Sequence, residues 1–131
     1  MKTDRLLVIS SLISIVFSTF HFASDVLRAR AGNNEQGGST LIAMPLIVIW
    51  LYGATVLAGR RSGNIIMLLA GVGAVGLALL HVMPSTGMFT GVLPRGAGGD
   101  FIFVWGLHVL VVSGMYSVIL ALRALFAADS Q

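Results

Sequence analysis

The chain has 131 residues, of which 56% are hydrophobic and only 10% are charged. A soluble domain carries roughly 25% charged residues, so this composition argues against a soluble protein and predicts an integral membrane protein. The eight basic residues are scattered near the ends of apolar segments, where they set membrane topology, so the net charge of +3 does not indicate nucleic-acid binding.

Residues 6–28 are predicted to form the first transmembrane helix. Polar residues recur along this segment at spacings of three and four, which places them on one face of a helix. The row consists of Ser11, Ser14, Ser18, His21, Asp25 and Arg28. Most other residues of the segment are Leu, Ile, Val and Phe, so we expect the polar face to be hidden from lipid. A signal peptide is the alternative, but a discarded peptide has no use for a regular polar row.

Two further spans are predicted at residues 41–58 and 65–82. Trp50 and Tyr52 fall in the middle of the first of these, which favours packing or internal hydrogen bonding over a place at the membrane interface. The second contains alanines repeating every four residues, together with three neighbouring glycines. The alanines are Ala70, Ala74 and Ala78. Rows of small residues let helix backbones approach closely in lipid, so we expect a tight helix contact here.

Residues 83–100 form the longest connection, which is either functional or a flexible connector. The fourth predicted span is 101–126. The four spans match a bilayer core of about 30 Å. The short loops between the first three spans imply antiparallel neighbours. The sequence therefore predicts one all-α domain over residues 1–131, an integral membrane four-helix antiparallel bundle with up-down-up-down topology.

The distribution of Lys and Arg predicts the orientation of this bundle. Five of the eight basic residues lie at the two termini and in the second loop, and three lie in the other two loops. Because basic residues favour the cytoplasmic side, both termini are expected in the cytoplasm, with the bundle in the inner or plasma membrane.

The three histidines are His21, His81 and His108, and each falls within a predicted span. Counted along the helices of an up-down bundle, they and Asp25 share the half that faces away from the cytoplasm. Imidazoles from different helices can hold a transition metal, or haem iron axially. Asp25, one turn beyond His21, could accept the second ring N–H of that histidine.

The chain contains no cysteine, which excludes disulfides and thiolate metal sites. Imidazole and carboxylate ligands then suit Zn, Cu or Fe. The first hypothesis is therefore a site for haem b or one of these metals, used for electron transfer or metal handling. The metal ligands would be His21, His81, His108 and Asp25. For haem, the simplest pair is His21 with His108, because their estimated depths agree best.

Two other classes of function remain open. The Ser/His/Asp row could form a hydrated proton or ion path in a transporter component, although helical serine more often bonds the carbonyl four residues earlier. Alternatively, the protein is a non-catalytic subunit in which these residues hold helices together or dock a partner helix. Ser117 is predicted to be a packing residue. Nothing marks a serine as a nucleophile, and enzymatic activity stays open. A homo-oligomer or larger membrane complex fits all three classes.

Overall fold

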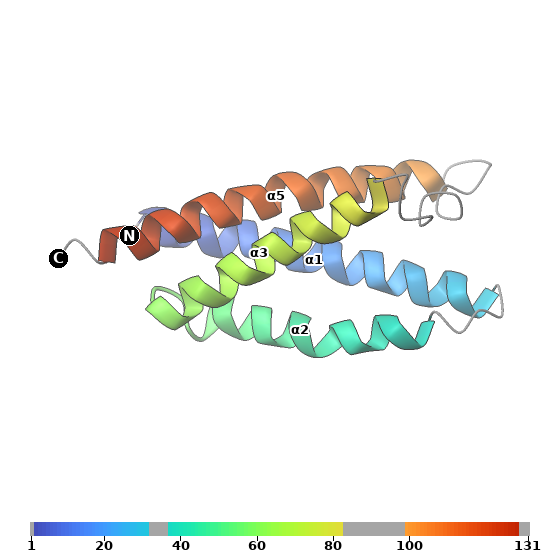
Figure 1. The fold of residues 1–131 in the computed structure, drawn as a ribbon, viewed down its shortest axis with the longest axis horizontal. Coiled ribbons are helices and arrows are strands. Elements are labelled where there is room, and N and C mark those ends of the chain that lie inside the picture. The colour runs from blue at the N-terminus through green and yellow to red at the C-terminus, as the bar shows by residue number, and fades with distance from the viewer. Residues whose placement is uncertain (1, 32–36, 83–98, 129–131) are drawn as a thin grey trace.

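A computed structural model describes residues 2–31, 37–82 and 99–128, with side chains described for 4–24, 26–27, 44–79 and 105–127. These residues form four helices. They are α1 (Lys2–Ala31), α2 (Gly37–Thr55), α3 (Arg61–Val82) and α5 (Gly99–Ala128). The helices run alternately in opposite directions (Figure 1). The predicted all-α, up-down-up-down bundle is therefore confirmed.

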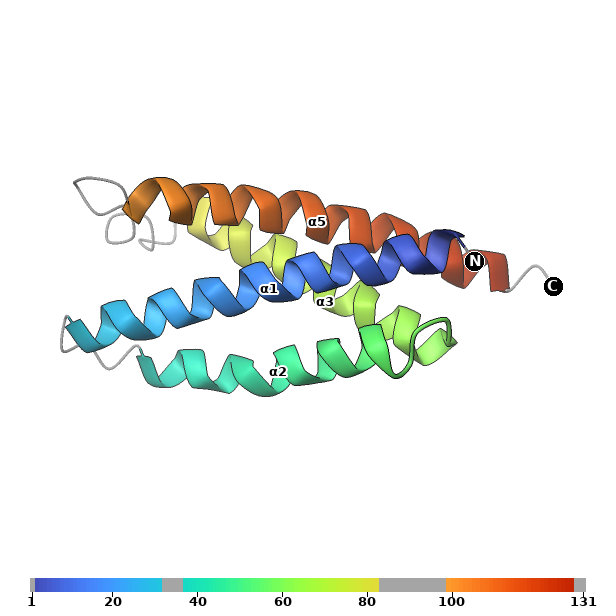
Figure 2. The same ribbon diagram turned by 180° about the vertical axis from the view of Figure 1, so that it is seen from behind.

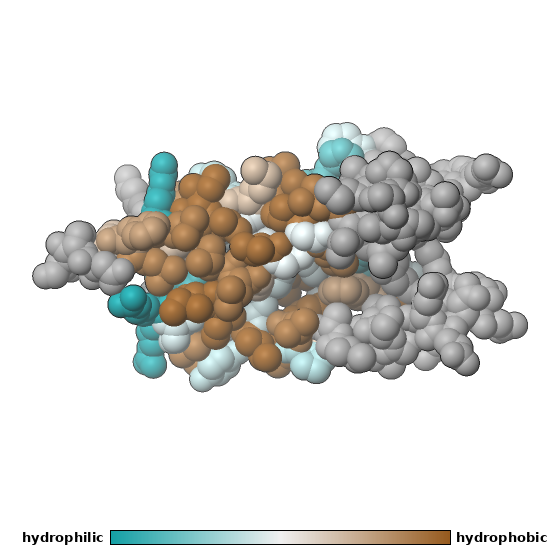
Figure 3. Space-filling model, viewed as in Figure 1, coloured by the Kyte–Doolittle hydropathy of each residue, from teal (hydrophilic) through white to brown (hydrophobic). Residues whose placement is uncertain are grey.

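Three of the described helices contain segments long and apolar enough to cross a membrane. These segments are Asp4–Ser24, Arg61–Leu79 and Trp105–Ala127. In α2, Met44–Thr55 forms a shorter apolar stretch. Brown, apolar side chains dominate the coloured part of the face in Figure 3, and hydrophilic ones gather toward the end where both termini lie. This is the surface of a membrane protein, because apolar side chains are outside as well as inside.

The four helices form a ring in which α1 and α3 each pack against both α2 and α5. The most extensive contact joins α3 to α5. There, a Cβ atom added to Gly71 would lie 3.1 Å from the Gly114 carbonyl oxygen, and Ala74 is buried beside Gly114. The predicted tight contact of the small-residue helix is confirmed, and its partner is α5.

The turn between α2 and α3 lies earlier in the chain than predicted, at residues 56–60 in place of 59–64. The predicted third span begins at residue 65, whereas α3 begins at Arg61. Gly59 in the turn has a positive φ of 75°, a conformation that glycine adopts readily. The Asn64 N–H donates to the Arg60 carbonyl at 3.0 Å, so these polar residues form the first turn of the helix. Glycine fits at position 63 because it has no Cβ atom, and a Cβ there would overlap the backbone carbonyl of Leu57.

Although α2 and α3 are consecutive, they share the smallest contact among neighbours in the ring. They meet near their connecting turn, where a Cβ added to Gly53 would lie 2.6 Å from Ile66 Cγ2. Figures 1 and 2 show the two helices separating toward their other ends, with α1 running alongside. This divergence opens the bundle on one side.

Candidate functional site

The polar face of α1 is turned into the bundle. The exposed fractions are 0% for Ser11 and Ser14, 3% for Ser18 and 5% for His21. Large apolar residues of the same helix are exposed instead, and examples are Ile9, Ile13, Val16 and Phe20. This pattern follows from a lipid environment, in which the apolar face needs no burial and the polar face does. The prediction is confirmed for these four residues, and the side chains of Asp25 and Arg28 lie outside the described residues.

Serines of α5 complete this polar row. The Ser14 hydroxyl donates to Ser113 Oγ at 2.7 Å, and the Ser117 hydroxyl donates to Ser10 Oγ at 2.9 Å. The Ser11 hydroxyl lies 3.5 Å from Ser117 Oγ. We call these buried residues the Ser/His row; its members are Ser10, Ser11, Ser14, Ser18 and His21 of α1, with Ser113 and Ser117 of α5.

Sequence reasoning missed the contribution of α5. It treated Ser117 as a packing residue and gave no role to Ser113. The available signal was their spacing of four residues, which matches the spacing of Ser10 and Ser14. Two antiparallel helices with hydroxyls at the same spacing can pair them across a contact in register. Ser117 does pack, since it is fully buried, but its hydroxyl also hydrogen-bonds α1.

The hydroxyls of the row have alternative acceptors. Ser14 Oγ lies 3.1 Å from the Ser10 carbonyl oxygen as well as 2.7 Å from Ser113 Oγ. Ser10 Oγ similarly lies 3.0 Å from the Leu7 carbonyl oxygen while accepting from Ser117. A serine hydroxyl carries one hydrogen and accepts through two lone pairs. Each of these hydroxyls can therefore rotate between a bond within its own helix and a bond across the row.

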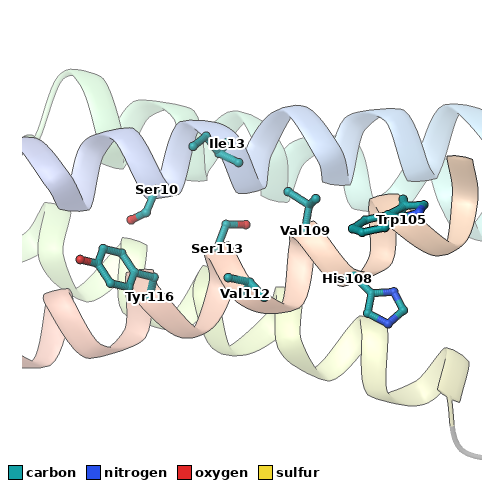
Figure 4. A pocket seen from close by; sticks show the side chains of 8 residues that line it. All are labelled: Ser10, Ile13, Trp105, His108, Val109, Val112, Ser113 and Tyr116. Atoms are coloured by element: carbon teal, nitrogen blue, oxygen red, sulfur yellow. The ribbon is translucent and has the colours of Figure 1, made fainter.

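His108 lies on the outer surface of the bundle. It is exposed, and its ring centroid lies 6.3 Å from that of Trp105. Both residues line a shallow groove of about 370 Å³, together with residues of α1 that include Ser10. Figure 4 shows the imidazole of His108 pointing away from α1.

The structure agrees with the predicted depth of His108 but gives it a different direction from His21. The Ser14–Ser113 hydrogen bond sets the register of the antiparallel helices α1 and α5. His21 is seven residues after Ser14, so it lies level with Gly106, which is seven residues before Ser113. His108 is two residues from that level, about 3 Å along the axis. His21 nevertheless faces the interior, and His108 faces outward.

Within one chain, the structure therefore does not bring His21 and His108 together as a haem pair. Among the residues with described side chains, no three metal-ligating groups gather at one point. The side chains of His81 and Asp25 lie outside the described residues. The haem or metal site with His21 thus stays a prediction.

Comparison of the chain with known protein families, with curated proteins and with solved structures finds no match. The functional assignment accordingly rests on the Ser/His row. Chemically, this row combines hydroxyls that both donate and accept hydrogen bonds with one buried imidazole.

We predict a measurable coupling between Ser14 and Ser113. In a double-mutant cycle of Ser14→Ala and Ser113→Ala, the coupling free energy should be about 0.6 kcal/mol and at most about 1.7 kcal/mol, the range for hydrogen bonds between membrane helices. The measurement is unfolding of the purified protein from mild detergent into SDS. Ser113→Ala combined with Thr55→Ala is the control, because among the described residues the Thr55 hydroxyl donates to the Leu51 carbonyl of its own helix and not to α5. Equal coupling in both cycles would contradict the pairing.

Proposed function

We propose that this protein carries protons along the Ser/His row, as a small transporter or as the proton-conducting part of a larger membrane complex. One observation supports this proposal above the others: hydroxyls from two helices hydrogen-bond one another inside a membrane bundle, in line with a buried histidine. Polar side chains within a bilayer are costly, and relays of hydroxyl, imidazole and carboxylate groups are a common reason for keeping them there.

The row has the length that a path needs. Ser10 and His21 are eleven residues apart, which is about 17 Å of helix and more than half of a hydrocarbon core of about 30 Å. In the sequence, Asp25 follows one turn after His21 and extends the row toward the same end. In this proposal the protein lies in the inner or plasma membrane with both termini on the cytoplasmic side. Protons would then enter beside the serines and leave beyond His21.

Histidine and serine would have different roles in this proton transfer. Histidine takes up and releases a proton near neutral pH more readily than any other side chain, so His21 is the group that would hold the proton. The serines would pass it by rotating between their alternative acceptors, as Ser14 can between Ser10 and Ser113. Water molecules entering the row would bridge the separation between Ser14 and His21.

Proton flux into vesicles tests this proposal. The purified protein is reconstituted into liposomes enclosing a pH-sensitive dye, and a potassium potential drives protons inward. We expect flux well above that of empty liposomes, reduced at least tenfold by His21→Ala. His108→Ala is the matched control, because this histidine lies at similar depth on the outer surface and should leave flux unchanged.

Circular dichroism and chromatographic mobility serve to check that both variants keep the wild-type fold. The proposal fails if wild-type flux equals that of empty liposomes, or if the two histidine substitutions reduce flux equally. A row that only holds α1 against α5 would give the first of these results.

A further inference from the structure

Four exposed arginine side chains gather at the end of the bundle where both termini lie. They belong to α1, to the turn before α3, to the start of α3 and to the last turns of α5. These residues are Arg5, Arg60, Arg61 and Arg123. Figure 3 shows hydrophilic side chains projecting from this end, next to a mostly apolar surface. The positive charge therefore comes from three helices and one turn, and not from a single run of sequence.

The contact between α1 and α5 places two of these arginines at the same depth. The Ser117 hydroxyl donates to Ser10 Oγ, which fixes the register of the two helices. Arg5 is five residues before Ser10, and Arg123 is six residues after Ser117. Because the helices are antiparallel, both arginines lie about 8–9 Å beyond this hydrogen bond, on the same side of it.

The contact between α3 and α5 adds a third arginine at this depth. The position of Gly71 lies directly against the Gly114 carbonyl oxygen. Arg61 is ten residues before Gly71, and Arg123 is nine residues after Gly114, so both lie about 14–15 Å beyond this contact. Three helices thus present a guanidinium group at one level of the bundle. We call the following residues the arginine layer: Arg5, Arg60, Arg61 and Arg123.

Apolar side chains are exposed directly on the membrane side of the arginine layer. Each lies one to four residues further into the bundle than an arginine of its own helix. These residues are Leu6, Ile65 and Leu122, with exposed fractions of 45%, 42% and 37%. The three segments that are long and apolar enough to cross a membrane each begin or end within four residues of the layer. The surface therefore carries positive charge at the level of lipid headgroups and apolar side chains at the level of acyl chains.

Carboxylates of the chain do not balance this charge. Among the described side chains, Asp4 is the only carboxylate at this end, and one carboxylate cannot neutralise four guanidinium groups. The sequence near the opposite end carries equal numbers of basic and acidic residues, namely Arg28, Arg30 and Arg95 with Asp25, Glu35 and Asp100. The excess of positive charge is thus confined to the end that carries the arginine layer.

We propose that the arginine layer binds phospholipids of net negative charge through their headgroup phosphates, with the acyl chains lying against Leu6, Ile65 and Leu122. A guanidinium group presents paired N–H donors that match two phosphate oxygens. A phosphatidylcholine headgroup also contains phosphate, but its own ammonium group cancels the charge. A soluble phosphate would leave the apolar surface below the layer without a partner. This binding does not depend on the proton path, so the two proposals can fail separately.

Quenching of tryptophan by brominated phospholipid tests this proposal at each end of the bundle. The chain has two tryptophans, so Trp50→Phe leaves Trp105, which is 56% exposed near the opposite end of α5. Adding Trp105→Phe and Leu122→Trp moves the reporter to the arginine layer. Both proteins are reconstituted in mixtures of phosphatidylglycerol and phosphatidylcholine in which either lipid carries bromine. We expect phosphatidylglycerol to bind roughly threefold more strongly than phosphatidylcholine, or better, at the Leu122→Trp reporter, and equally at Trp105.

Substituting arginines tests whether they cause this preference. Arg5→Gln with Arg123→Gln should abolish the preference for phosphatidylglycerol at the Leu122→Trp reporter. Arg5→Lys with Arg123→Lys keeps the charge but not the paired donors, and should retain part of the preference. Arg28→Gln with Arg30→Gln is the matched control, because it removes the same charge from the opposite end of α1 and should leave the preference unchanged.

Three results would overturn phospholipid binding by the arginine layer. One is equal binding of the two lipids at the Leu122→Trp reporter. Another is an equal loss of preference in the two pairs of glutamine substitutions, because net charge alone would then attract the lipid. The third is relief of the phosphatidylglycerol quenching by inorganic phosphate at constant ionic strength, which would show that the layer takes phosphate from water.

Discussion

Replacing Gly63 with alanine is expected to lower the free energy of unfolding by about 3 kcal/mol, the upper part of the range for overpacked positions. The added Cβ would overlap the carbonyl group of Leu57, which belongs to the backbone and cannot rotate away. Either the turn between α2 and α3 must open or the first turn of α3 must unwind. Unfolding in SDS, followed by circular dichroism, measures the loss.

Ser62→Ala provides the control for this effect. Ser62 precedes Gly63 in the same helical turn and is exposed, so its substitution should change the unfolding free energy by less than about 0.5 kcal/mol. If Gly63→Ala and Ser62→Ala unfold at the same SDS fraction, the tight turn described for residues 56–60 is incorrect.

Gly71→Leu is expected to separate α3 from α5. Its Cβ would lie 3.1 Å from the Gly114 carbonyl oxygen and 3.1 Å from Val118 Cγ2, and the rest of the leucine side chain has to enter the same contact. Since this is the most extensive helix contact in the bundle, we expect a loss of about 2–3 kcal/mol or more. Thermal unfolding in detergent measures it.

Gly73→Leu is the matched substitution, two residues along the same helix. Among the described residues, no atom lies within 4 Å of a Cβ added at this position, so we expect helix propensity to dominate, and leucine should leave stability equal or raise it by up to about 1 kcal/mol. A result in which Gly73→Leu destabilises as much as Gly71→Leu would show that α5 does not pack on the Gly71 face.

Much of the fold follows from the sequence because lipid imposes simple rules. The lengths of the apolar segments predicted four helices, and the short loops between the first three segments predicted that neighbouring helices are antiparallel. The spacing of Ser11, Ser14, Ser18 and His21 predicted a buried face on α1, because polar residues avoid lipid. The helix α3 begins four residues before the span predicted at 65–82, since polar residues at 61–64 are compatible both with a loop and with a first helical turn.

The direction of single side chains was harder to predict. Trp50 is buried as expected, but Tyr52 is half exposed, because its place on α2 faces outward. His108 has the predicted depth, yet rotation of α5 about its axis turns it outside, and residue spacing within α5 alone does not set that rotation. A groove of about 590 Å³ beside Trp50 depends on the angle between α2 and α3, which only the packed bundle determines.

The proton-transfer proposal requires that the serines of α1 and α5 face one another in the interior, and disulfide trapping measures this most directly. The native chain has no cysteine, so Ser14→Cys with Ser113→Cys gives a clean pair. Their Oγ atoms lie 2.7 Å apart, and we expect near-complete crosslinking under mild oxidation. Ile13→Cys with Met115→Cys, both on exposed positions, should remain reduced. A reduced Ser14–Ser113 pair, or equal crosslinking of both pairs, would contradict the account.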